Sequence, residues 1–469
     1  MHQTDSEYAS SVRKELIGFL NSSPCNFYAV RTTAEILDAH GFTPLDEKDE
    51  WNLEAGGKYY VVKNSSAIFA FIVGSGKVAE NGFRIISAHT DSPGFKIKPN
   101  CEIYGDGRVV SLNVEKYGGP IMYTWFDRPL SVAGRVMLRG EDALHPVEIL
   151  VDLHRPVATV PHLAIHFNRA VNEGNSLSVQ KDMKPVVGYF TEQEIAEMKN
   201  SGGVIRRMLA VALNEGERYY NKDAKPEGAE EAPAVTGYSI TPDDILDYEL
   251  MLYPCEEACA VGVNSEFLQS GRIDDLSMAY CGIRALLDTE QQACEATRIV
   301  ALFDNEETGS GTKQGAASPV LRHIVERLCA GVGEAPQDLY RAIAASFMIS
   351  ADDAHGWHPN YNDKYDPTNH PVLGGGPVVK INANCKYMTD ARGAAVFHSL
   401  CQDAGVNMQY FVNHSDVAGG STLGNISSQQ LDLNGVDVGC AIWAMHSARE
   451  TAAFSDHVDM IRTFRQFFV

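Results

Sequence analysis

The sequence predicts an α/β fold in which a mainly β domain interrupts a sheet covered by helices. Apolar segments of strand length alternate with segments of helical periodicity at both ends of the chain, whereas the middle is rich in Val and Gly. The chain has 469 residues, and single hydrophobic cores stop growing at roughly 250–300 residues. We therefore expect two domains: a discontinuous α/β domain at residues 1–96 and 247–469, and an inserted β-rich domain at residues 97–246.

Helices and buried strands are expected in the first part of the α/β domain. Residues 1–50 carry apolar side chains at helical spacing, which predicts helices. Ala67–Val73 and Phe83–Ala88 are short and mostly apolar, which is typical of strands buried on both faces of a parallel sheet.

The middle of the chain predicts short strands separated by turns. The expected strands are Val109–Val114, Leu130–Leu138 and Val147–Leu153. Asn221–Gly237 is rich in Lys, Glu, Pro and Ala and predicts an exposed loop. Thr241–Asp244 predicts the start of a helix, with Thr at the N-cap and Pro in the first turn.

The α/β pattern returns after Tyr248. The expected strands are Ile299–Phe303, Phe347–Ser350, Val378–Ile381, Met408–Val412 and Cys440–Met445. The expected helices include Leu276–Leu287, Pro319–Leu328 and Asp390–Ala404. This alternation indicates a sheet with helices packed on it.

Charge and cysteine content limit the partners and the compartment. The net charge is -22, from 39 Lys and Arg against 61 Asp and Glu, so we expect neither nucleic acid nor a membrane surface as a partner. Apolar runs such as Ala67–Val73 are far shorter than the ~20 residues that span a bilayer. The first residues have no basic or apolar signal region. Among the ten scattered cysteines only Cys255 and Cys259 lie close in sequence, which predicts reduced thiols and a cytoplasmic protein.

Acids and imidazoles follow four of the predicted strands. They are His89 and Asp91, Asp304 to Glu307, Asp352 to His355, and His446. Ligands of open α/β sheets bind at the carboxyl ends of the strands, and a carboxylate buried there is costly unless a cation neutralises it. A set of histidines and carboxylates without cysteine suits zinc, cobalt or manganese.

Each of these pieces also has a simpler structural explanation. His89 with Asp91 can be a surface or capping pair, and Glu306-Glu307 can form the acidic first turn of a helix. Asp274-Asp275 can cap the helix expected from Leu276, and His446 can be a core histidine. Their joint occurrence, each after an apolar strand or before a helix, favours a metal site.

Dinuclear hydrolysis assigns these residue types distinct roles. One aspartate can bridge two metal ions roughly 3.5–4 Å apart, and a water between the ions ionises near neutral pH. One carboxylate must stay off the metal as general base; in the Glu306-Glu307 pair, one residue can ligate while the other faces the water. Asp91 can accept the second ring N–H of His89 and so orient that ring.

At these residues the chain resembles the aspartyl aminopeptidases, a family of dinuclear zinc exopeptidases. The matching stretches follow the family's order over nearly the whole chain. They are Ser87–Pro93, Tyr123–Arg128, Pro161–His166, Asp304–Ser310, Ser350–His355 with His358–Tyr361, and Ala444–Glu450.

The resemblance implies a zinc aminopeptidase-type catalytic domain with two zinc ions per subunit, for which Co²⁺ or Mn²⁺ can substitute. The implied ligands are His89 and Asp352 on one ion, Glu307 and His446 on the other, and Asp274 between them. Glu306 would be the general base, and catalytic Asp91 would orient His89. The family often has Asp-Asn-Leu where this chain has Asp274-Asp275-Leu276, and we take Asp274 as the bridge.

The resemblance also implies contacts with peptide substrates and with other subunits. Asp352 would meet the substrate's α-amine, and His355 would contact the scissile group. Lys380 and Tyr387 would line the pocket for the N-terminal side chain, where an ammonium would favour Asp or Glu. His166, in the inserted domain, would reach a neighbouring active site in a homododecamer. The loop His414–Ser421 departs from the pattern of the eukaryotic members.

The sequence therefore predicts a metalloaminopeptidase that hydrolyses the N-terminal bond of peptides through a metal-bridging hydroxide with a glutamate base. Two alternatives stay open at this point. One is a dinuclear amidohydrolase or deacetylase acting on small N-acyl compounds, and the other is a catalytically idle homologue that serves as a scaffold.

Overall fold

The computed structural model describes residues 3–215 and 239–469 and falls into two compact units. Unit 1 contains residues 1–92 and 258–469, and unit 2 contains residues 93–257. The boundaries expected from the sequence, after residues 96 and 246, would cut through two strands, β5 (Gly94–Tyr104) and β10 (Ile245–Pro254). These two strands pair with each other in unit 2, so both belong wholly to the inserted unit.

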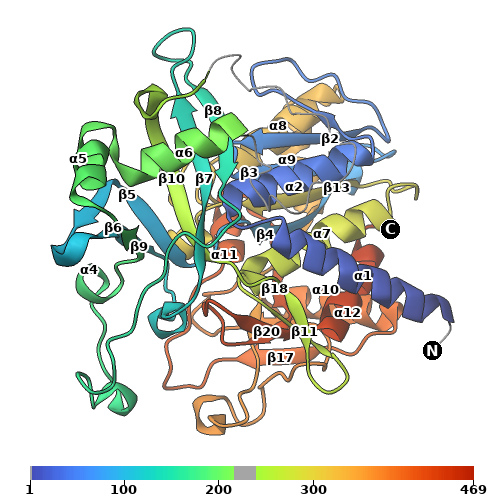
Figure 1. The fold of residues 1–469 in the computed structure, drawn as a ribbon. Coiled ribbons are helices and arrows are strands. Elements are labelled where there is room, and N and C mark those ends of the chain that lie inside the picture. The colour runs from blue at the N-terminus through green and yellow to red at the C-terminus, as the bar shows by residue number, and fades with distance from the viewer. Residues whose placement is uncertain (1–2, 216–238) are drawn as a thin grey trace. The chain divides into compact units, whose positions relative to one another are not determined.

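Unit 1 is built on a mixed sheet. Within the described residues this sheet has nine strands in the order β1-β2-β3-β13-β4-β14-β18-β16-β17. Figure 1 labels β2, β3, β13 and β4 among them. Their bounds are β1 Thr43–Pro44, β2 Lys58–Lys63, β3 Ala67–Ile72, β13 Thr297–Phe303, β4 Phe83–His89, β14 Phe347–Ala351, β18 Asn434–Gly439, β16 Val378–Ile381 and β17 Gln409–Val412.

Helices cover both faces of this sheet. They are α1 Gln3–Asn21, α2 Asn26–Ala39, α3 Val78–Asn81, α7 Ile273–Asp288, α8 Val320–Gly331, α9 Asp338–Ala345, α10 Ala391–Ala404, α11 Leu423–Leu431 and α12 Phe454–Phe467. Alternate residues of β13 enter two different cores: Val300 packs in the cluster that includes α7 and α12, and Ile299 in the cluster that includes α8 and α9. The middle of β13 is therefore apolar at consecutive positions, because each face of the sheet has its own layer of helices.

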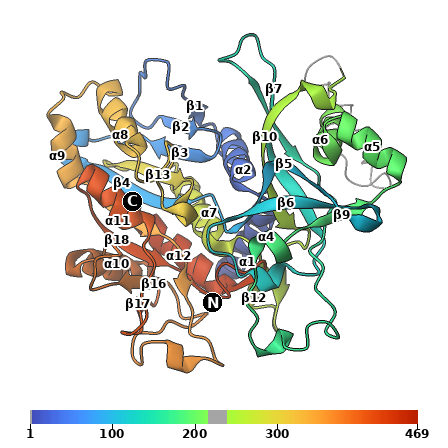
Figure 2. The ribbon, with the colours of Figure 1, turned by 90° about the vertical axis from the view of Figure 1, so that its left-hand side faces the viewer.

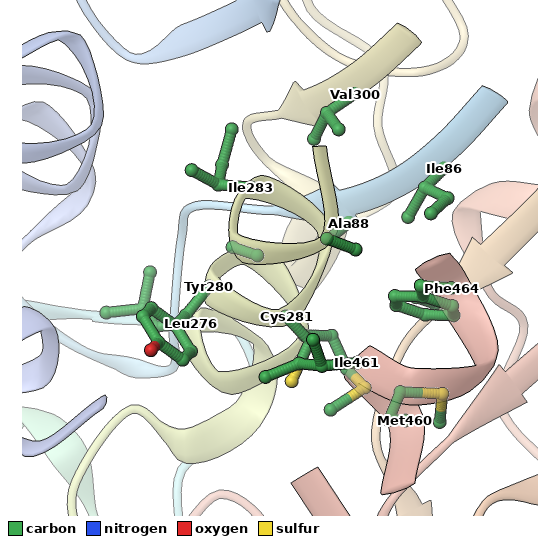
Figure 3. Close-up of a cluster of buried hydrophobic side chains, with 14 of the residues drawn as sticks. Ile86, Ala88, Leu276, Tyr280, Cys281, Ile283, Val300, Met460, Ile461 and Phe464 are labelled. Atoms are coloured by element: carbon green, nitrogen blue, oxygen red, sulfur yellow. The ribbon is translucent and has the colours of Figure 1, made fainter. Parts of the chain in front are cut away.

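Helix α7 packs between the sheet and α12. Its side chains Leu276, Tyr280, Cys281 and Ile283 are buried in one cluster with residues of the sheet and of α12 (Figure 3). The partners labelled there are Ile86 and Ala88 of β4, Val300 of β13, and Met460, Ile461 and Phe464 of α12. This packing fixes the helix whose first residues include Asp274.

The carboxyl ends of three parallel strands meet at one edge of the sheet. β4 lies between β13 and β14 and is parallel to both. His89, the last residue of β4, pairs with Phe303, the last residue of β13. Ser87 pairs with Ser350 of β14, so Asp352 follows at the level of His89. The residues after these strands are thereby brought side by side.

A smaller sheet in unit 1 carries the last segment of the site. Its order is β11-β12-β20-β19-β15, with bounds β11 Cys259–Val261, β12 Phe267–Ser270, β20 Glu450–Ala453, β19 Ala441–Trp443 and β15 Ala354–His355. The strand expected at Cys440–Met445 is wrong in its length and in its sheet. β18 of the large sheet ends at Gly439 and the short β19 of the small sheet begins at Ala441, so His446 lies in a turn after β19.

Unit 2 is a mainly β unit with short helices (Figure 2). Its described strands form the order β8-β7-β10-β5-β6-β9. The bounds not yet given are β6 Val109–Tyr117, β7 Leu130–Leu138, β8 Val147–Asp152, β9 Val186–Tyr189, α4 Val179–Asp182, α5 Glu192–Asn200 and α6 Gly203–Glu215. The unit confirms the inserted β-rich fold.

The helix expected from Thr241 is wrong. The Thr241 and Asp244 side chains form a capping box, but the helical segment is only the 3₁₀ turn Pro242–Asp244. The chain then enters β10, where Tyr248, Leu250 and Leu252 are buried and alternate with more exposed residues. The loop expected at Asn221–Gly237 lies outside the described residues. Among the described residues no helix has the length and apolar character needed to cross a membrane.

Candidate metal centre

The Asp274-Asp275 pair precedes the regular part of helix α7. Arg272 is left-handed and both aspartates have non-helical backbone angles. Oδ2 of Asp275 accepts the backbone N–H of His89 instead of one from the helix, and among the described residues Oδ1 of each aspartate accepts no hydrogen bond. The capping explanation for this pair therefore fails. Both side chains are buried, so their carboxylates need partners from the surrounding site.

Asp274 lies between the two candidate histidine ligands. Its Oδ1 is 3.5 Å from Nε2 of His89, and its Oδ2 is 3.5 Å from Nε2 of His446. Among the described residues, Oδ1 accepts no hydrogen bond although it is buried. Each oxygen of this carboxylate thus faces a different imidazole, as a bridging ligand requires.

Asp91 and Asp275 contact His89 at atoms other than Nε2, the ring nitrogen that faces Asp274. Nδ1 of His89 is 2.9 Å from the backbone oxygen of Asp91 and 3.3 Å from its Oδ1. Asp275 Oδ2 accepts the backbone N–H of His89 at 3.0 Å. Nδ1 is therefore the nitrogen that carries the proton, which leaves Nε2 as the metal-binding atom.

Asp91 also positions the glutamate pair. Its two carboxylate oxygens accept the backbone N–H groups of Glu306 at 3.1 Å and of Glu307 at 3.2 Å. Glu306 and Glu307 lie in the 3₁₀ turn Glu306–Thr308, which starts after left-handed Asn305. The pair is not the first turn of an α-helix, so the explanation by a helix dipole does not apply.

Among the described residues, three overlapping groups of side chains could hold metal ions. In each group one ligand atom per residue lies within 4.8 Å of all the others. The groups are His89 with Asp274, Asp275 and Asp352; His89 with Glu306 and Glu307; and Asp274 with Glu307 and His446. All five expected ligands and Glu306 are brought together. Oδ1 of Asp274 and Oδ1 of Asp275 are buried and accept no hydrogen bond among the described residues, so a cation would satisfy them.

The acids and imidazoles of the site shift one another's pKa values. Burial lowers the pKa of His446, but contacts with Asp274 and Glu307 outweigh it and raise the pKa to about 11. Burial raises the pKa of Glu306 well above its usual range; His89 opposes this shift, and the Asp352 and Glu307 carboxylates add to it. Acids and imidazoles packed this closely are stabilised by bound divalent cations.

Two buried acids to which the sequence assigned no role, Glu450 and Asp353, hold the backbone around the site. Glu450 accepts the N–H groups of Asp274 and His446. Asp353 accepts the Ser277 hydroxyl at 2.9 Å and the backbone N–H of Cys440 at 3.3 Å. Glu450 begins a strand whose other residues are Thr and Ala, and an acid in such a strand is the only sequence signal for it.

Lys380 is buried beside Asp352 rather than open to a pocket. Its side chain is 2% exposed. Nζ donates to the backbone oxygens of Asp352 at 2.7 Å and Asp353 at 3.3 Å, and lies 3.4 Å from Oδ1 of Asp352. These contacts direct the ammonium toward Asp352 and Asp353. The expected role of Lys380 in binding the N-terminal side chain of the substrate stays a prediction.

The remaining expected substrate contacts are spread over several elements. His355 is exposed at the end of β15, with its ring 5.6 Å from that of Phe411. Tyr387 is buried and its ring centroid lies 5.5 Å from Nζ of Lys380. His166 is exposed in unit 2, in the segment between β8 and β9.

Comparison with known proteins decides the family. Residues 19–468 match the model of the aminopeptidase I zinc metalloproteases, M18. This chain belongs to the M18 family. It is a zinc-dependent aminopeptidase, and the resemblance to the aspartyl aminopeptidases is confirmed.

Individual M18 proteins match along almost the full chain. A probable M18 family aminopeptidase 2 of Clostridium novyi (strain NT) is 42% identical over 454 residues, covering 97% of this chain and 98% of its own. Ape4, solved in complex with Nbr1, superposes with a TM-score of 0.90 at 34% identity, covering 100% of this chain and 87% of that one. The S. cerevisiae mApe1 dodecamer gives a TM-score of 0.80 at 27% identity, covering 98% and 97%.

The Lys380 contacts lead to a prediction for the M18 reaction. We expect Lys380→Met to lower kcat/KM by a similar factor, about 10–100-fold, for substrates that begin with Asp, Glu, Leu or Ala. The reason is that the ammonium holds the backbone and the carboxylate of Asp352, a candidate ligand, whatever the substrate.

Lys386→Met is the matched control, because Lys386 is exposed in the segment after the same strand. Steady-state kinetics on the four substrates distinguish the two roles of Lys380. A loss restricted to Asp and Glu substrates would show that the Lys380 ammonium binds the acidic side chain of the substrate.

Proposed function

We propose that this M18 aminopeptidase binds two zinc ions per subunit and uses them to hydrolyse the first peptide bond of a peptide. His89 and Asp352 would hold one ion, and Glu307 and His446 the other, with Asp274 between them. Co²⁺ or Mn²⁺ would substitute for zinc, since imidazole and carboxylate donors accept all three.

The position of Asp274 carries this proposal. Its two oxygens face Nε2 of His89 and Nε2 of His446 at 3.5 Å each. Glu307 Oε1 lies 3.4 Å from the same nitrogen of His446. One carboxylate shared between two sets of ligands is the arrangement that two-metal hydrolases use.

Bound zinc would supply Lewis acidity at the scissile carbonyl and favour ionisation of a water at the site. Glu306 would take the proton of that water and pass it to the leaving amine. Asp91 supports this role, because it fixes the backbone of Glu306 and Glu307.

The test of the proposed reaction is its dependence on a free α-amine. We expect aminoacyl-nitroanilides to be hydrolysed, and their N-acetyl derivatives not, because an exopeptidase must recognise the terminal ammonium. Asp352 would meet that group, and His355 would contact the scissile group. Preferred hydrolysis of the N-acetyl compounds would favour a deacetylase or amidohydrolase, and hydrolysis of neither would favour an idle scaffold.

The same assay addresses the N-terminal residue. We include in the proposal a preference for Asp or Glu, which the resemblance to the aspartyl aminopeptidases supports. Comparing kcat/KM for Asp-, Glu-, Leu- and Ala-nitroanilide measures it directly. Faster cleavage of the neutral substrates would remove the acidic preference and leave the two-metal reaction unaffected.

We also propose that the chain assembles into a homododecamer through unit 2. The segment around His166 exposes the large apolar side chains Leu163, Ile165 and Phe167, the last of them 82% exposed. Contiguous exposed apolar residues of this kind mark protein interfaces. The mApe1 relative is described as a dodecamer.

Subunit mixing tests whether His166 completes a neighbouring site. His166→Ala and Glu306→Gln are each expected to be inactive alone. Co-assembled in equal amounts, they should regain activity at up to about a quarter of the sites, where an intact Glu306 meets a neighbour's intact His166. Absence of recovery in particles verified to contain both variants would mean that each subunit works by itself.

A further inference from the structure

Glu450 is a buried acid that contacts two candidate metal ligands only through their backbones. It is the first residue of β20 and is 1% exposed. Oε1 accepts the backbone N–H of His446 at 2.7 Å, and Oε2 accepts that of Asp274 at 3.2 Å. Its carboxylate therefore links the turn before β20 to the irregular first turn of α7.

The two linked residues lie outside regular secondary structure. His446 has a positive φ of 68° and follows Ala444, whose φ is 56°. Asp274 has non-helical backbone angles although the helix is about to begin. Neither residue lies in a regular helix or strand, so a regular hydrogen-bond pattern does not set the direction of its side chain.

We propose that Glu450 is a positioning residue that holds Asp274 and His446 in place for metal binding. This inference rests on the proposed two-metal site. Because both oxygens accept an N–H, the ionised carboxylate is the form that satisfies both donors. The ion held by Glu307 and His446 depends on both linked residues, whereas the ion held by His89 and Asp352 depends only on Asp274. Loss of Glu450 weakens the first ion more than the second.

Glu450→Gln removes this function with little change in shape. The amide has one oxygen and one NH₂ group, so one of the two backbone N–H groups faces another donor. We expect the zinc ion held by Glu307 and His446 to bind more weakly, with a dissociation constant about 10–100-fold higher. This is the range found when groups that support metal ligands are removed. Glu450→Asp, which is too short to reach both N–H groups, should act in the same direction.

Asp456 provides a matched control in the same unit. This buried aspartate accepts two backbone N–H groups, from Gly374 at 2.8 Å and from Gly376 at 3.0 Å, neither of them a candidate ligand. Asp456→Asn makes the same chemical change, a carboxylate replaced by an amide between two N–H donors. Its zinc affinity should equal that of the wild type.

The experiment is a zinc titration of the metal-free full-length proteins against a chromophoric chelator, with the melting temperature of each metal-free protein measured alongside. The expected result is weaker zinc binding by both Glu450 variants and unchanged binding by Asp456→Asn. A Glu450 variant that melts earlier but binds zinc like the wild type, or failure of both variants to fold with zinc present, assigns Glu450 to fold stability and overturns the inference. A wild type that binds fewer than two ions contradicts the proposed site instead.

Discussion

Glu306→Gln should retain both metal ions and lose most of the catalytic rate. Gln matches Glu in shape but cannot accept a proton, and positioned proton transfer is typically worth ~10²–10⁴-fold in rate. Asp91 holds Glu306 through its backbone N–H, so the substitution leaves that anchor intact. The measurement is kcat together with zinc content per chain.

Glu307→Gln is the matched comparison, because it makes the same chemical change one residue later. Glu307 lies 3.4 Å from His446 and in a candidate ligand group with Asp274. We expect this variant to bind zinc more weakly and to recover activity in part when zinc is added. If Glu306→Gln lost zinc and Glu307→Gln kept it, the two roles would be reversed.

The fold could be predicted where the sequence pattern has a single physical reading. β3 is apolar at every position, and β13 from Ile299 onward, because helices cover both faces of their sheet. That composition is visible in the sequence. The strand at Cys440–Met445 was misplaced because the apolar run continues while the chain passes from one sheet to another at Cys440. Hydrophobicity does not record which sheet a strand joins.

A competing signal explains the error at Thr241. A capping box and an early proline start a 3₁₀ turn as well as a helix, and here the turn has three residues. The following segment alternates buried Tyr248, Leu250 and Leu252 with Asp247 and Glu249. This period of two is typical of a strand and should have outweighed the cap.

The sequence predicted the part of the candidate site that consists of side chains placed directly after strands. Acids and imidazoles placed after buried strands meet at one sheet edge, so His89, Glu307 and Asp352 could be grouped from the strand pattern. Contacts to the backbone leave no such pattern. Glu450 accepts the N–H of Asp274, which lies 176 residues away, and Lys380 donates to carbonyl oxygens that any residue type would offer.

Removal of metal should abolish hydrolysis completely, and zinc, cobalt or manganese should restore it at about two ions per chain. The ligand groups contain buried carboxylate oxygens that accept no hydrogen bond among the described residues. A cation is therefore needed both for the reaction and to satisfy these atoms. Dialysis against a chelator, metal analysis and a nitroanilide assay measure this; full turnover by protein shown to be free of metal would rule the mechanism out.

Two neighbouring substitutions then identify the bridging residue. Asp274→Asn should prevent restoration, because a neutral amide offers one oxygen where the site needs two facing His89 and His446. Asp275→Asn should still bind metal, because an amide oxygen can accept the His89 backbone N–H as Oδ2 does. If Asp275→Asn lost the metal and Asp274→Asn kept it, Asp275 would be the bridging ligand. The carboxylate that accepts the backbone N–H of His89 would then also have to bind both zinc ions.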